Sequence, residues 1–422
     1  MKIRLRLAGY NDTLEIIVPN TWKVEDLLHL LNIHESSIII RINRTIMTED
    51  HPLKEGDFVE IYPLGAQFSP KLINLLKVLE ARIEKSNTLE RRTTFNDTNR
   101  GCSFCKEEET IIRYKYIIGG VIHSYKLCKK CFLNNVENKV LRLINWYNVV
   151  QSNDSILVAL SGEKDSVLTL YFLKKYLDEE GEDFTLHALT VNCGLGEYDK
   201  RRIQYARKLC KMLNVQHEVI SIEEHYEWGL KKIFEKRKKE LTNSDLTICD
   251  VCAIMRSRLI YDFAYKEGYN KIAEGYNLEE RITSSLVAHV YGDHLMQTFV
   301  GEPIIPGRYY CFNIKRVRIL MNLSSKEVGL YIFIKNIPTL FRYEYQCPFY
   351  TFRARGIHKY AGFINEAFPG ITYLLKRRTE RNNYSRLKKY VKTCEKCNVT
   401  FLSLLKRKIC DICYIKETLK LD

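Results

Sequence analysis

Ten of the fourteen cysteines of this chain occur in five C-x-x-C pairs, and this spacing restricts the possible folds more than any other feature. A C-x-x-C pair presents two thiolates on one tight turn, and two pairs complete the four-coordinate tetrahedron that zinc accepts. Small metal-binding modules are therefore expected in the chain. The pairs are Cys102/Cys105, Cys128/Cys131, Cys249/Cys252, Cys394/Cys397 and Cys410/Cys413.

Four of these pairs combine into two sets of four cysteines. A disulfide framework is the alternative, but it requires an oxidising compartment, and the N-terminus MKIRLRLAGYNDTLEI alternates charged with apolar residues instead of forming a signal-peptide core. No apolar run is long enough to span a membrane. We predict a soluble, cytoplasmic protein with two structural Zn²⁺ sites, formed by Cys102, Cys105, Cys128 and Cys131 and by Cys394, Cys397, Cys410 and Cys413.

The central pair, Cys249/Cys252, has no second C-x-x-C pair to complete it. It could be a redox pair, an incomplete site, or part of an iron–sulfur site with a distant third cysteine, which would leave one iron open for chemistry. Spacing cannot select the third ligand among the four remaining cysteines, which are Cys193, Cys210, Cys311 and Cys347.

The composition is that of an ordered globular protein with about two to four domains. Of the 422 residues, 45% are hydrophobic and 28% charged, and the net charge is +15. Residues 371–422 alone carry 14 basic and 5 acidic residues, a net charge of +9. This basic tail is a candidate phosphate-binding surface, although basic tails are also often only solvated faces.

The N-terminal residues 1–68 predict a small α+β unit, because alternating apolar residues indicate strands and a turn precedes the last of them. Residues 69–100 predict a helical connector followed by a polar linker. The predicted strands cover 2–7, 14–18, 38–42 and 58–62, and the helix covers 24–31.

The central residues predict an α/β fold with a doubly wound parallel sheet, since apolar strand candidates alternate with helical stretches. The strand at 156–160 is followed by a Ser/Gly loop and a helix over 167–177. The other strands are predicted at 186–191, 216–220 and 271–273, with helices over about 136–150 and from about 199, 223, 253 and 278.

The loop after the first central strand, Ser161-Gly162-Glu163-Lys164-Asp165-Ser166, suits a phosphate group. Helix N-terminal amides, two hydroxyl groups and a lysine converge there. The segment LVALSGEKDSVL resembles the PP-loop, SGGKDS, of ATP pyrophosphatases that adenylate a carbonyl oxygen. Together with the cysteine modules, residues 102–413 look like the tRNA 2-thiouridine synthetase family of ATP-dependent tRNA sulfurtransferases.

Three further segments are similar to motifs of that family. Residues 249–258, CDVCAIMRSR, resemble C-x-x-C-G-x-x-R-R; residues 273–280, AEGYNLEE, resemble A-T-G-H-N-L-D-D; and residues 346–349, QCPF, resemble Glu-Cys-Pro-Tyr. The last match implies Cys347 as the third ligand of a [4Fe–4S] cluster, with Cys249 and Cys252.

The resemblance also implies the residues of the nucleotide site. Lys164 and Asp165, together with the cluster cysteines, would be catalytic. ATP and Mg²⁺ would bind at Ser161, Gly162, Lys164, Asp165, Ser166, Leu189, Arg256, Gly275 and Glu280.

The chain departs from the family pattern at several positions. Glu163 replaces the second glycine of the PP-loop, Asn192-Cys193-Gly194 stands where the family has Asp-Glu-Gly, and Tyr276 and Glu280 replace His and Asp.

The segment IIIRINRTIMTEDHPLKEGDFVEIYPLG resembles the C-terminal half of ubiquitin-like sulfur carriers of the MoaD/ThiS type, which have a β-grasp fold. Those carriers end in Gly-Gly, whereas this chain continues beyond Gly65. A docking or structural role is therefore expected for this unit.

The resemblance predicts five segments and one reaction. The segments are a β-grasp domain (1–68), a connector (69–100), a zinc module (101–135), a PP-loop catalytic domain (136–370) and a basic zinc module (371–422). The predicted reaction is ATP-dependent thiolation of a tRNA uridine to 2-thiouridine. A 2-thiocytidine product and a non-catalytic tRNA-binding or sulfur-relay adaptor are the alternatives. The expected partners are tRNA and a sulfur donor or ubiquitin-like sulfur carrier, and a homodimer is allowed.

Overall fold

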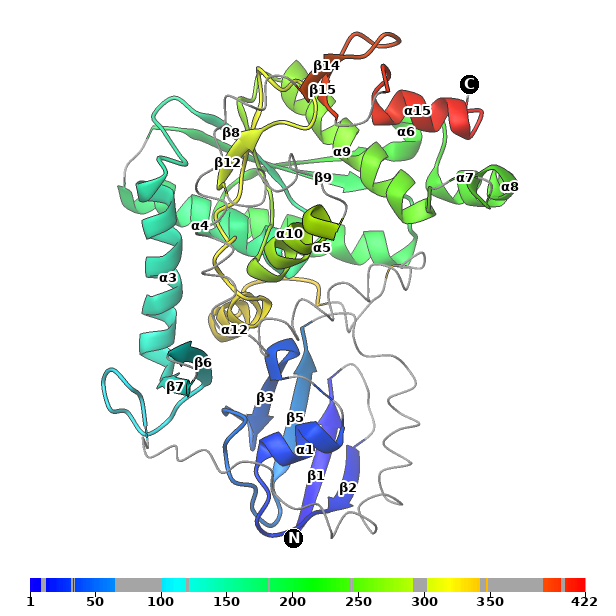
Figure 1. The fold of residues 1–422 in the computed structure, drawn as a ribbon. Coiled ribbons are helices and arrows are strands. Elements are labelled where there is room, and N and C mark those ends of the chain that lie inside the picture. The colour runs from blue at the N-terminus through cyan, green and yellow to red at the C-terminus, as the bar shows by residue number, and fades with distance from the viewer. Residues whose placement is uncertain are drawn as a thin grey trace.

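A computed structural model of the chain contains an N-terminal unit, a central α/β unit and two cysteine modules (Figure 1). The predicted connector over 69–100, Lys406, Gln346, Pro348 and Phe349 lie outside the described residues. The described residues are 1–8, 13–31, 33, 35–64, 101–118, 121–180, 183–242, 244, 246–290, 302–341, 347, 390–403 and 407–421.

The N-terminal unit is a mixed five-stranded sheet in the order β2-β1-β5-β3-β4. Strand β1 pairs in parallel with β5, and the other pairs are antiparallel. The predicted strands and helix are confirmed to within about two residues. The elements are β1 (Lys2–Leu7), β2 (Thr13–Ile17), α1 (Val24–Leu30), η1 (Glu35–Ser37), β3 (Ile38–Ile42), β4 (Thr45–Ile46) and β5 (Phe58–Pro63).

The central unit contains the predicted parallel sheet, in the order β10-β9-β8-β11-β13-β12. Only the edge strand β12 is antiparallel among these six. The order in which the chain adds strands reverses between the parallel neighbours β8 and β11. Ligands of such folds bind at this point, outside the carboxyl ends of the strands. The strands are β8 (Ser155–Ala159), β9 (Thr185–Asn192), β10 (Gln216–Ser221), β11 (Lys271–Ala273), β12 (Ile304–Pro306) and β13 (Lys315–Val317).

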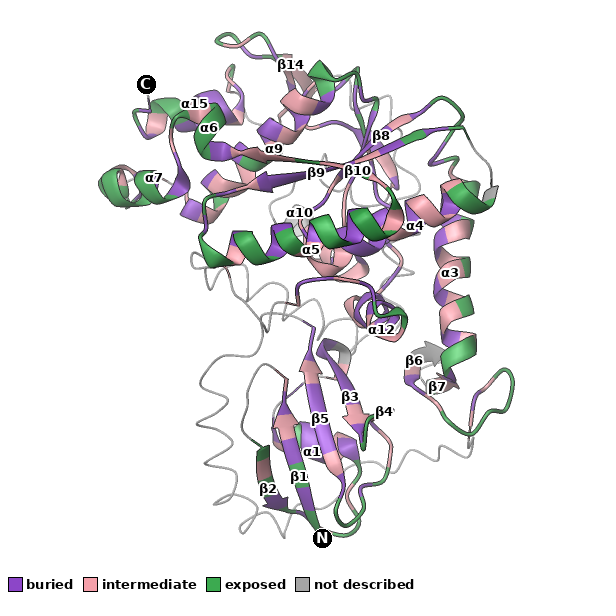
Figure 2. Cartoon of the chain, turned by 180° about the vertical axis from the view of Figure 1, so that it is seen from behind, coloured by how far each residue is buried: buried purple, intermediate pink, exposed green. Residues whose placement is uncertain are grey.

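Helices cover both faces of this sheet. Helices α4 and α5 pack on one face, α9 lies on the other, and the outward side of α5 is exposed while its inner side is buried (Figures 1 and 2). The described helices of this unit are α4 (Lys164–Glu180), α5 (Glu197–Leu213), α6 (Ile222–Tyr226), α7 (Leu230–Lys236), α8 (Lys238–Thr242), α9 (Ile248–Lys266), α10 (Leu278–Val290) and α12 (Ser325–Lys335).

Helix α9 begins before the predicted residue 253, so that prediction was wrong. Thr247 caps the helix: its hydroxyl accepts a hydrogen bond from the Asp250 amide at 3.2 Å, and the Asp250 carboxylate accepts one from the Thr247 amide at 2.8 Å. This reciprocal capping starts the helix early. Cys249 and Cys252 therefore lie on its first turn and not in a preceding loop.

The cysteine modules each combine a short antiparallel hairpin with a helix. The first contains β6 (Ile112–Ile118), β7 (Val121–Leu127) and α3 (Lys129–Trp146), and the second contains β14 (Val391–Thr393), β15 (Thr400–Leu402) and α15 (Asp411–Thr418). Helix α3 starts before the predicted residue 136 because Cys128 is its N-cap. None of the helices in the described ranges is long and apolar enough to cross a membrane.

Candidate functional site

The loop between β8 and α4 closes on itself through its two serines. The Ser161 amide donates to Ser166 Oγ at 3.0 Å, and the two serine hydroxyl oxygens lie 2.9 Å apart. Gly162 has a φ of +79°, and a Cβ there would lie 2.1 Å from the carbonyl oxygen of Arg202. The loop therefore requires glycine at this position, both for its backbone angle and for its contact with α5.

Lys164 and Asp165 lie at the N-terminus of α4, where the helix dipole favours bound anions. Lys164 Nζ contacts both carboxylate oxygens of Asp165, at 2.8 and 2.7 Å, and Asn277 Nδ2 donates to Asp165 Oδ1 at 2.9 Å. A Cβ on Gly275 would lie 2.4 Å from the Ser166 amide nitrogen. The loops after β8 and β11 thus meet at the point where the strand order reverses.

Glu163, which departs from the PP-loop pattern, points toward α5. Its carboxylate accepts a hydrogen bond from the Tyr198 hydroxyl. The neighbouring Gly162 carbonyl accepts from the Leu340 amide at 2.9 Å, and the Leu160 amide donates to the Leu189 carbonyl at 2.9 Å. The loop is thereby held on both sides, and Tyr198 gives the extra carboxylate a partner.

Glu279 and Glu280, which follow Leu278, have different hydrogen-bond partners. Glu280 Oε2 accepts from the Asn277 amide at 3.2 Å, and Asn277 Oδ1 accepts from the Glu280 amide at 3.0 Å, so Glu280 caps α10. Glu279, which the sequence analysis did not select, accepts from the Ser325 amide at 2.8 Å. Burial raises the pKa of Glu279 to about 7, although Ser325 and Lys164 act in the opposite direction.

The first turn of α9 carries Cys249 and Cys252 next to the end of β9. Cys193 and Cys252 shift each other's pKa, and Cys252 lies within electrostatic reach of Cys347. Cys252 and Cys347 pack against the apolar cluster that includes Cys193. Cys347 as the third ligand stays a prediction of the motif match, and Cys193 is a further thiol in this region.

Arg256, one turn further along α9, is exposed, and its guanidinium lies within electrostatic reach of Cys252, Cys193 and Glu163. The neighbouring Cys252 thiol and the charges of Arg202 and Arg256 lower the pKa of Cys193 to about 7, although burial acts against them.

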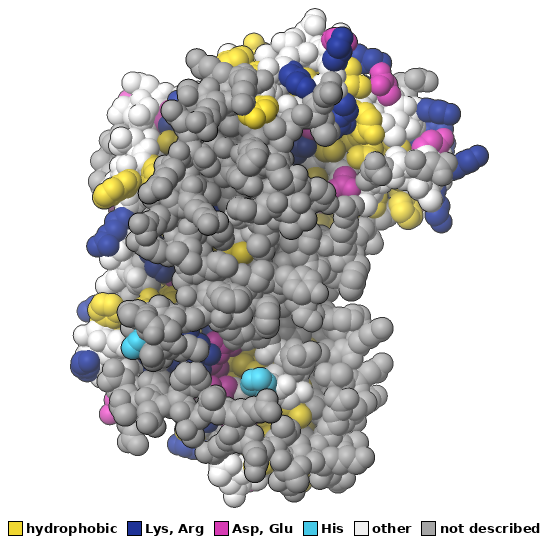
Figure 3. All heavy atoms as spheres, in the orientation of Figure 1, with side chains coloured by type: hydrophobic (Ala, Val, Ile, Leu, Met, Phe, Trp, Pro, Cys, Tyr) yellow, Lys and Arg dark blue, Asp and Glu magenta, His cyan; other side chains and the backbone are white. Residues whose placement is uncertain are grey.

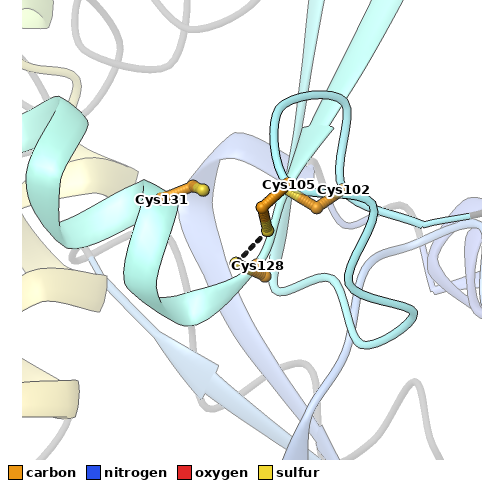
Figure 4. Close-up of side chains that lie close together, drawn as sticks. All are labelled: Cys102, Cys105, Cys128 and Cys131. Atoms are coloured by element: carbon orange, nitrogen blue, oxygen red, sulfur yellow. Dashed lines mark hydrogen bonds between the residues drawn. The ribbon is translucent and has the colours of Figure 1, made fainter.

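The two predicted sets of four cysteines are assembled, and we call them the first and second tetrads. In each set all four sulfur atoms lie within 4.8 Å of one another, as tetrahedral ligands of one metal ion require. Figure 4 shows the first tetrad, in which Cys105 and Cys128 lie 3.5 Å apart. The first tetrad is Cys102, Cys105, Cys128 and Cys131, and the second is Cys394, Cys397, Cys410 and Cys413.

Hydrogen bonds from backbone amides favour the thiolate form of one cysteine in each tetrad. Burial acts to raise the pKa of Cys102 and of Cys394, but amide donors within the turns outweigh it and lower both values to about 6. The Cys410 amide, for example, donates to Cys394 Sγ at 3.3 Å. All fourteen cysteines are free thiols in this structure, so the disulfide alternative is not realised.

Cys249, Cys252 and Cys347 do not form a group as tight as the tetrads within the described part of the chain. This spacing does not suit one zinc ion. It is compatible with a multi-iron cluster, because the iron atoms of a cluster stand between its cysteine ligands. The donor set of three thiols beside a guanidinium therefore fits an iron–sulfur cluster better than a single ion.

Basic side chains gather at the end of the molecule formed by α7, α8 and the second tetrad (Figure 3). The Arg237 guanidinium donates to the Lys420 carbonyl at 3.0 Å and so joins α7–α8 to α15. The sequence analysis assigned only the tail to this role and missed the two helices. We call this the basic end; its exposed lysines include Lys231, Lys236, Lys238, Lys239, Lys396, Lys408, Lys416 and Lys420.

Comparisons with known proteins agree with this site. The family pattern described as the PP-loop domain matches residues 132–241. The chain is 28% identical over 254 residues to the tRNA-5-methyluridine(54) 2-sulfurtransferase of Pyrococcus horikoshii, covering 59% of this chain and 71% of that protein. It is 26% identical over 258 residues to the tRNA 2-thiolation protein NcsA of Haloferax volcanii, covering 58% and 77%.

A solved structure shares the fold. The U34-tRNA thiolase NcsA of Methanococcus maripaludis, solved with its [4Fe–4S] cluster, superposes with a TM-score of 0.58 at 21% identity, covering 76% of this chain and 97% of that one. Residues 132–241 match the PP-loop domain, and over more than half of its length the chain is similar to tRNA 2-thiolation proteins and tRNA 2-sulfurtransferases.

Proposed function

We propose that this protein is an ATP-dependent tRNA sulfurtransferase that converts a uridine to 2-thiouridine. One observation carries the proposal: the PP-loop with Lys164 and Asp165 lies at the strand-order reversal, and Arg256 of α9 lies within electrostatic reach of both Glu163 in that loop and Cys252. A site for adenylation and a site for sulfur chemistry would thereby be neighbours. The names of the related proteins support the same reaction.

The PP-loop would bind the phosphates of ATP. The uridine C2 oxygen attacks the α-phosphorus, pyrophosphate leaves, and a sulfur nucleophile then attacks C2 and expels AMP. Lys164 and Arg256 neutralise phosphate charge, and the α4 amides orient the phosphate groups. Catalysis of this kind depends mainly on positioning and charge compensation.

Cys249, Cys252 and Cys347 would hold a [4Fe–4S] cluster. Bound with three cysteines, such a cluster supplies an iron that can take up sulfide. The half-buried thiols and the nearby Arg256 charge fit a negatively charged group of this size. Asp165 and Glu280 are the carboxylates that would bind the Mg²⁺ of ATP, with Glu280 also capping α10.

The two tetrads would each bind a structural Zn²⁺. Their short sulfur–sulfur distances and amide donors support a tetrahedral ion with four thiolates. The basic end, next to the second tetrad, would bind tRNA phosphates, and shape rather than base sequence would guide this contact.

The N-terminal unit would be a β-grasp domain of the ubiquitin-like type. The strand order β2-β1-β5-β3-β4 with a parallel β1–β5 pair and one crossing helix supports this assignment. Because the chain continues after β5, the unit would act in docking and not as a sulfur carrier. The sulfur would come from a separate donor or carrier, and the name of a fungal relative, cytoplasmic tRNA 2-thiolation protein 1, supports a cytoplasmic reaction.

The test is anaerobic reconstitution with iron and sulfide, followed by incubation with tRNA, ATP and sulfide. Pyrophosphate is quantified, and the nucleosides are identified by mass spectrometry. Lys164→Ala is expected to lower both products about 100-fold or more, because it removes a phosphate cation. Cys347→Ala is expected to abolish thiolation. Lys174→Ala, which changes an ion pair with Asp178 on the same helix, is the matched control.

The outcomes separate the alternatives. Thiouridine that depends on Lys164 and Cys347 supports the proposal, and thiocytidine would change the substrate. Protein that binds tRNA but releases no pyrophosphate in the presence of any tested sulfur donor would contradict it and favour a non-catalytic adaptor.

A further inference from the structure

A fourth cysteine lies beside the three proposed cluster ligands. Cys193 follows β9, is 2% exposed, and belongs to the apolar cluster against which Cys252 and Cys347 pack, where Cys193 and Cys252 lie within electrostatic reach of each other. Cys252 in turn lies within electrostatic reach of Cys347. Because Cys249 and Cys252 are three residues apart on one helical turn, four thiols gather at the start of α9.

The loop that carries Cys193 is fixed by a buried ion pair. Asp199 Oδ2 accepts hydrogen bonds from the amides of Cys193 and Leu195, at 2.9 and 2.8 Å, and the Asp199 carboxylate also pairs with Arg202. Arg202 Nη2 lies 3.5 Å from Cys193 Sγ. Asp199 and Arg202 are both buried, so the thiol is held in place beside α9.

The charges around Cys193 suit a metal-bound thiolate. Each thiolate that binds an iron–sulfur cluster makes the buried group more negative, and a buried negative charge must be compensated. Arg202 lies against Cys193, and Arg256 acts on both Cys193 and Cys252. Cys193 stands where the resembled pattern has a glutamate, so a carboxylate position has become a thiol position beside the cluster.

We propose that Cys193 is a fourth ligand of the iron–sulfur site and binds the iron that Cys249, Cys252 and Cys347 leave open. This inference rests on the cluster assignment in the proposed function. Cys193 would then be a displaceable ligand: hydrosulfide could take its place on the iron, and the released Cys193 thiolate would accept the proton of hydrosulfide, with no electron transferred. A fourth cysteine would also protect the reactive iron until sulfur arrives.

The test uses the full chain, reconstituted anaerobically, and compares wild type with Cys193→Ala and Cys193→Ser. One-electron oxidation of a [4Fe–4S]²⁺ cluster by ferricyanide can release one Fe²⁺ and leave [3Fe–4S]⁺, which EPR detects. Three-cysteine clusters release this iron readily because nothing from the protein holds it. The matched control is Cys210→Ala, which removes a buried thiol from α5.

Wild type and Cys210→Ala are expected to keep the iron, whereas Cys193→Ala is expected to form [3Fe–4S]⁺ about tenfold faster. Cys193→Ser, which keeps the size of the side chain and can still bind iron, is expected to fall between them. Its EPR signal in the reduced state is expected to differ from that of wild type, which guards against a folding defect in Cys193→Ala.

Two results would overturn the inference. If wild type releases the iron as fast as Cys193→Ala while Cys347→Ala assembles no cluster, Cys193 is not a ligand, and the proposed function stands. If no variant, including wild type, assembles a cluster, both the inference and the cluster of the proposed function are wrong.

Discussion

The two tetrads have the same ligands but different neighbours. In both, one cysteine caps a helix and another lies on the first turn of that helix: Cys128 and Cys131 on α3, Cys410 and Cys413 on α15. Beyond this shared plan they diverge. The hairpin of the first tetrad faces the N-terminal unit, whereas the second tetrad packs on α9.

Ion pairs connect the hairpin of the first tetrad to the N-terminal unit. Arg113 on β6 contacts Glu25 at 3.1 Å and Glu49 at 3.2 Å, and Lys115 contacts Glu35 at 2.8 Å. Glu49 is 1% exposed and also pairs with Lys326 of α12 at 3.3 Å. The hairpin beside the first tetrad therefore contacts the N-terminal unit through ion pairs.

The second tetrad receives a side chain from α9, the helix that carries Cys249 and Cys252. Arg258 Nη1 lies 3.6 Å from both Cys397 Sγ and Cys410 Sγ, and Arg258 Nε donates to Asp262 at 2.7 Å. A guanidinium beside metal thiolates compensates their charge. Two tetrads built from the same C-x-x-C pairs thus have different surroundings: the first lies beside a hairpin that contacts the N-terminal unit, and the second receives Arg258 from α9.

The largest effect is expected when one cysteine of each tetrad is replaced in turn. Cys394→Ser should destabilise the protein by about 4 kcal/mol or more, because loss of a structural metal also exposes the apolar residues of α15 packed against α9. Because α9 positions Cys249 and Cys252, bound iron should fall together with zinc. Metal content by mass spectrometry and thermal unfolding measure both effects.

Cys102→Ser is the matched control for this experiment. It should lower zinc by one ion per chain but leave iron unchanged, because Cys102 and Cys128 pack in a different apolar cluster from the buried residues of α9. Equal loss of iron in the two variants would show that the tetrads do not differ in the way described.

Breaking the ion pairs that Glu49 of the N-terminal unit forms with the hairpin and with α12 is expected to give the next largest effect. Glu49→Gln removes a buried negative charge between Arg113 and Lys326, whose side chains are 7% and 13% exposed. Leaving two buried cations without this partner should cost about 3 kcal/mol. Chemical denaturation measures the change in stability, and limited proteolysis should show the N-terminal unit released first.

Glu15→Gln provides the comparison for that variant. Glu15 pairs with Lys2 on the surface of the same unit, and both side chains are more than half exposed. Its effect should stay within about 0.5 kcal/mol. Similar destabilisation in the two variants would argue against a contact held by buried charge.

A smaller effect is expected at Arg258. Arg258→Met removes the donor to Cys397 and Cys410 and should weaken zinc binding at the second tetrad about 10- to 100-fold. The first tetrad in the same molecule is the internal control, because only one of two zinc ions should leave faster to a chelator. Asp262→Asn keeps the Arg258 guanidinium near the sulfurs. If zinc also leaves the second tetrad faster in that variant, altered packing and not the lost guanidinium would explain the effect of Arg258→Met.

Much of the fold could be predicted from the sequence, and the errors have physical causes. Alternating apolar residues predicted the strands of the N-terminal unit, and short apolar runs between helical stretches predicted those of the parallel sheet, because burial of one face leaves alternation and burial of both faces leaves a continuous run. The start of α9 was missed because a C-x-x-C pair suggested a turn, whereas Thr247 and Asp250 cap a helix there. The start of α3 was missed in the same way, since Cys128 is both a member of a C-x-x-C pair and the N-cap residue of the helix.

The site could be predicted only where its residues are close in sequence. The PP-loop and both tetrads follow from local motifs, and their assembly is observed. Cys193 could not be separated from the other single cysteines, because its place near Cys252 depends on how β9 and α9 pack. Glu279 was not selected beside Glu280, because sequence cannot show that its carboxylate accepts a hydrogen bond from the distant Ser325 amide.

The smallest effect is expected at the basic end, and it tests whether α7–α8 and the second tetrad act together. Lys238→Ala with Lys239→Ala should weaken tRNA binding and reduce the slope of log affinity against log salt by about 0.7 to 0.9 for each phosphate that the variant no longer neutralises. Arg407→Ala with Lys408→Ala should do the same. Lys2→Ala with Lys54→Ala removes equal charge from the N-terminal unit and should leave the slope unchanged. A slope that falls equally in all three variants would mean that net charge, and not a surface built around the second tetrad, attracts tRNA.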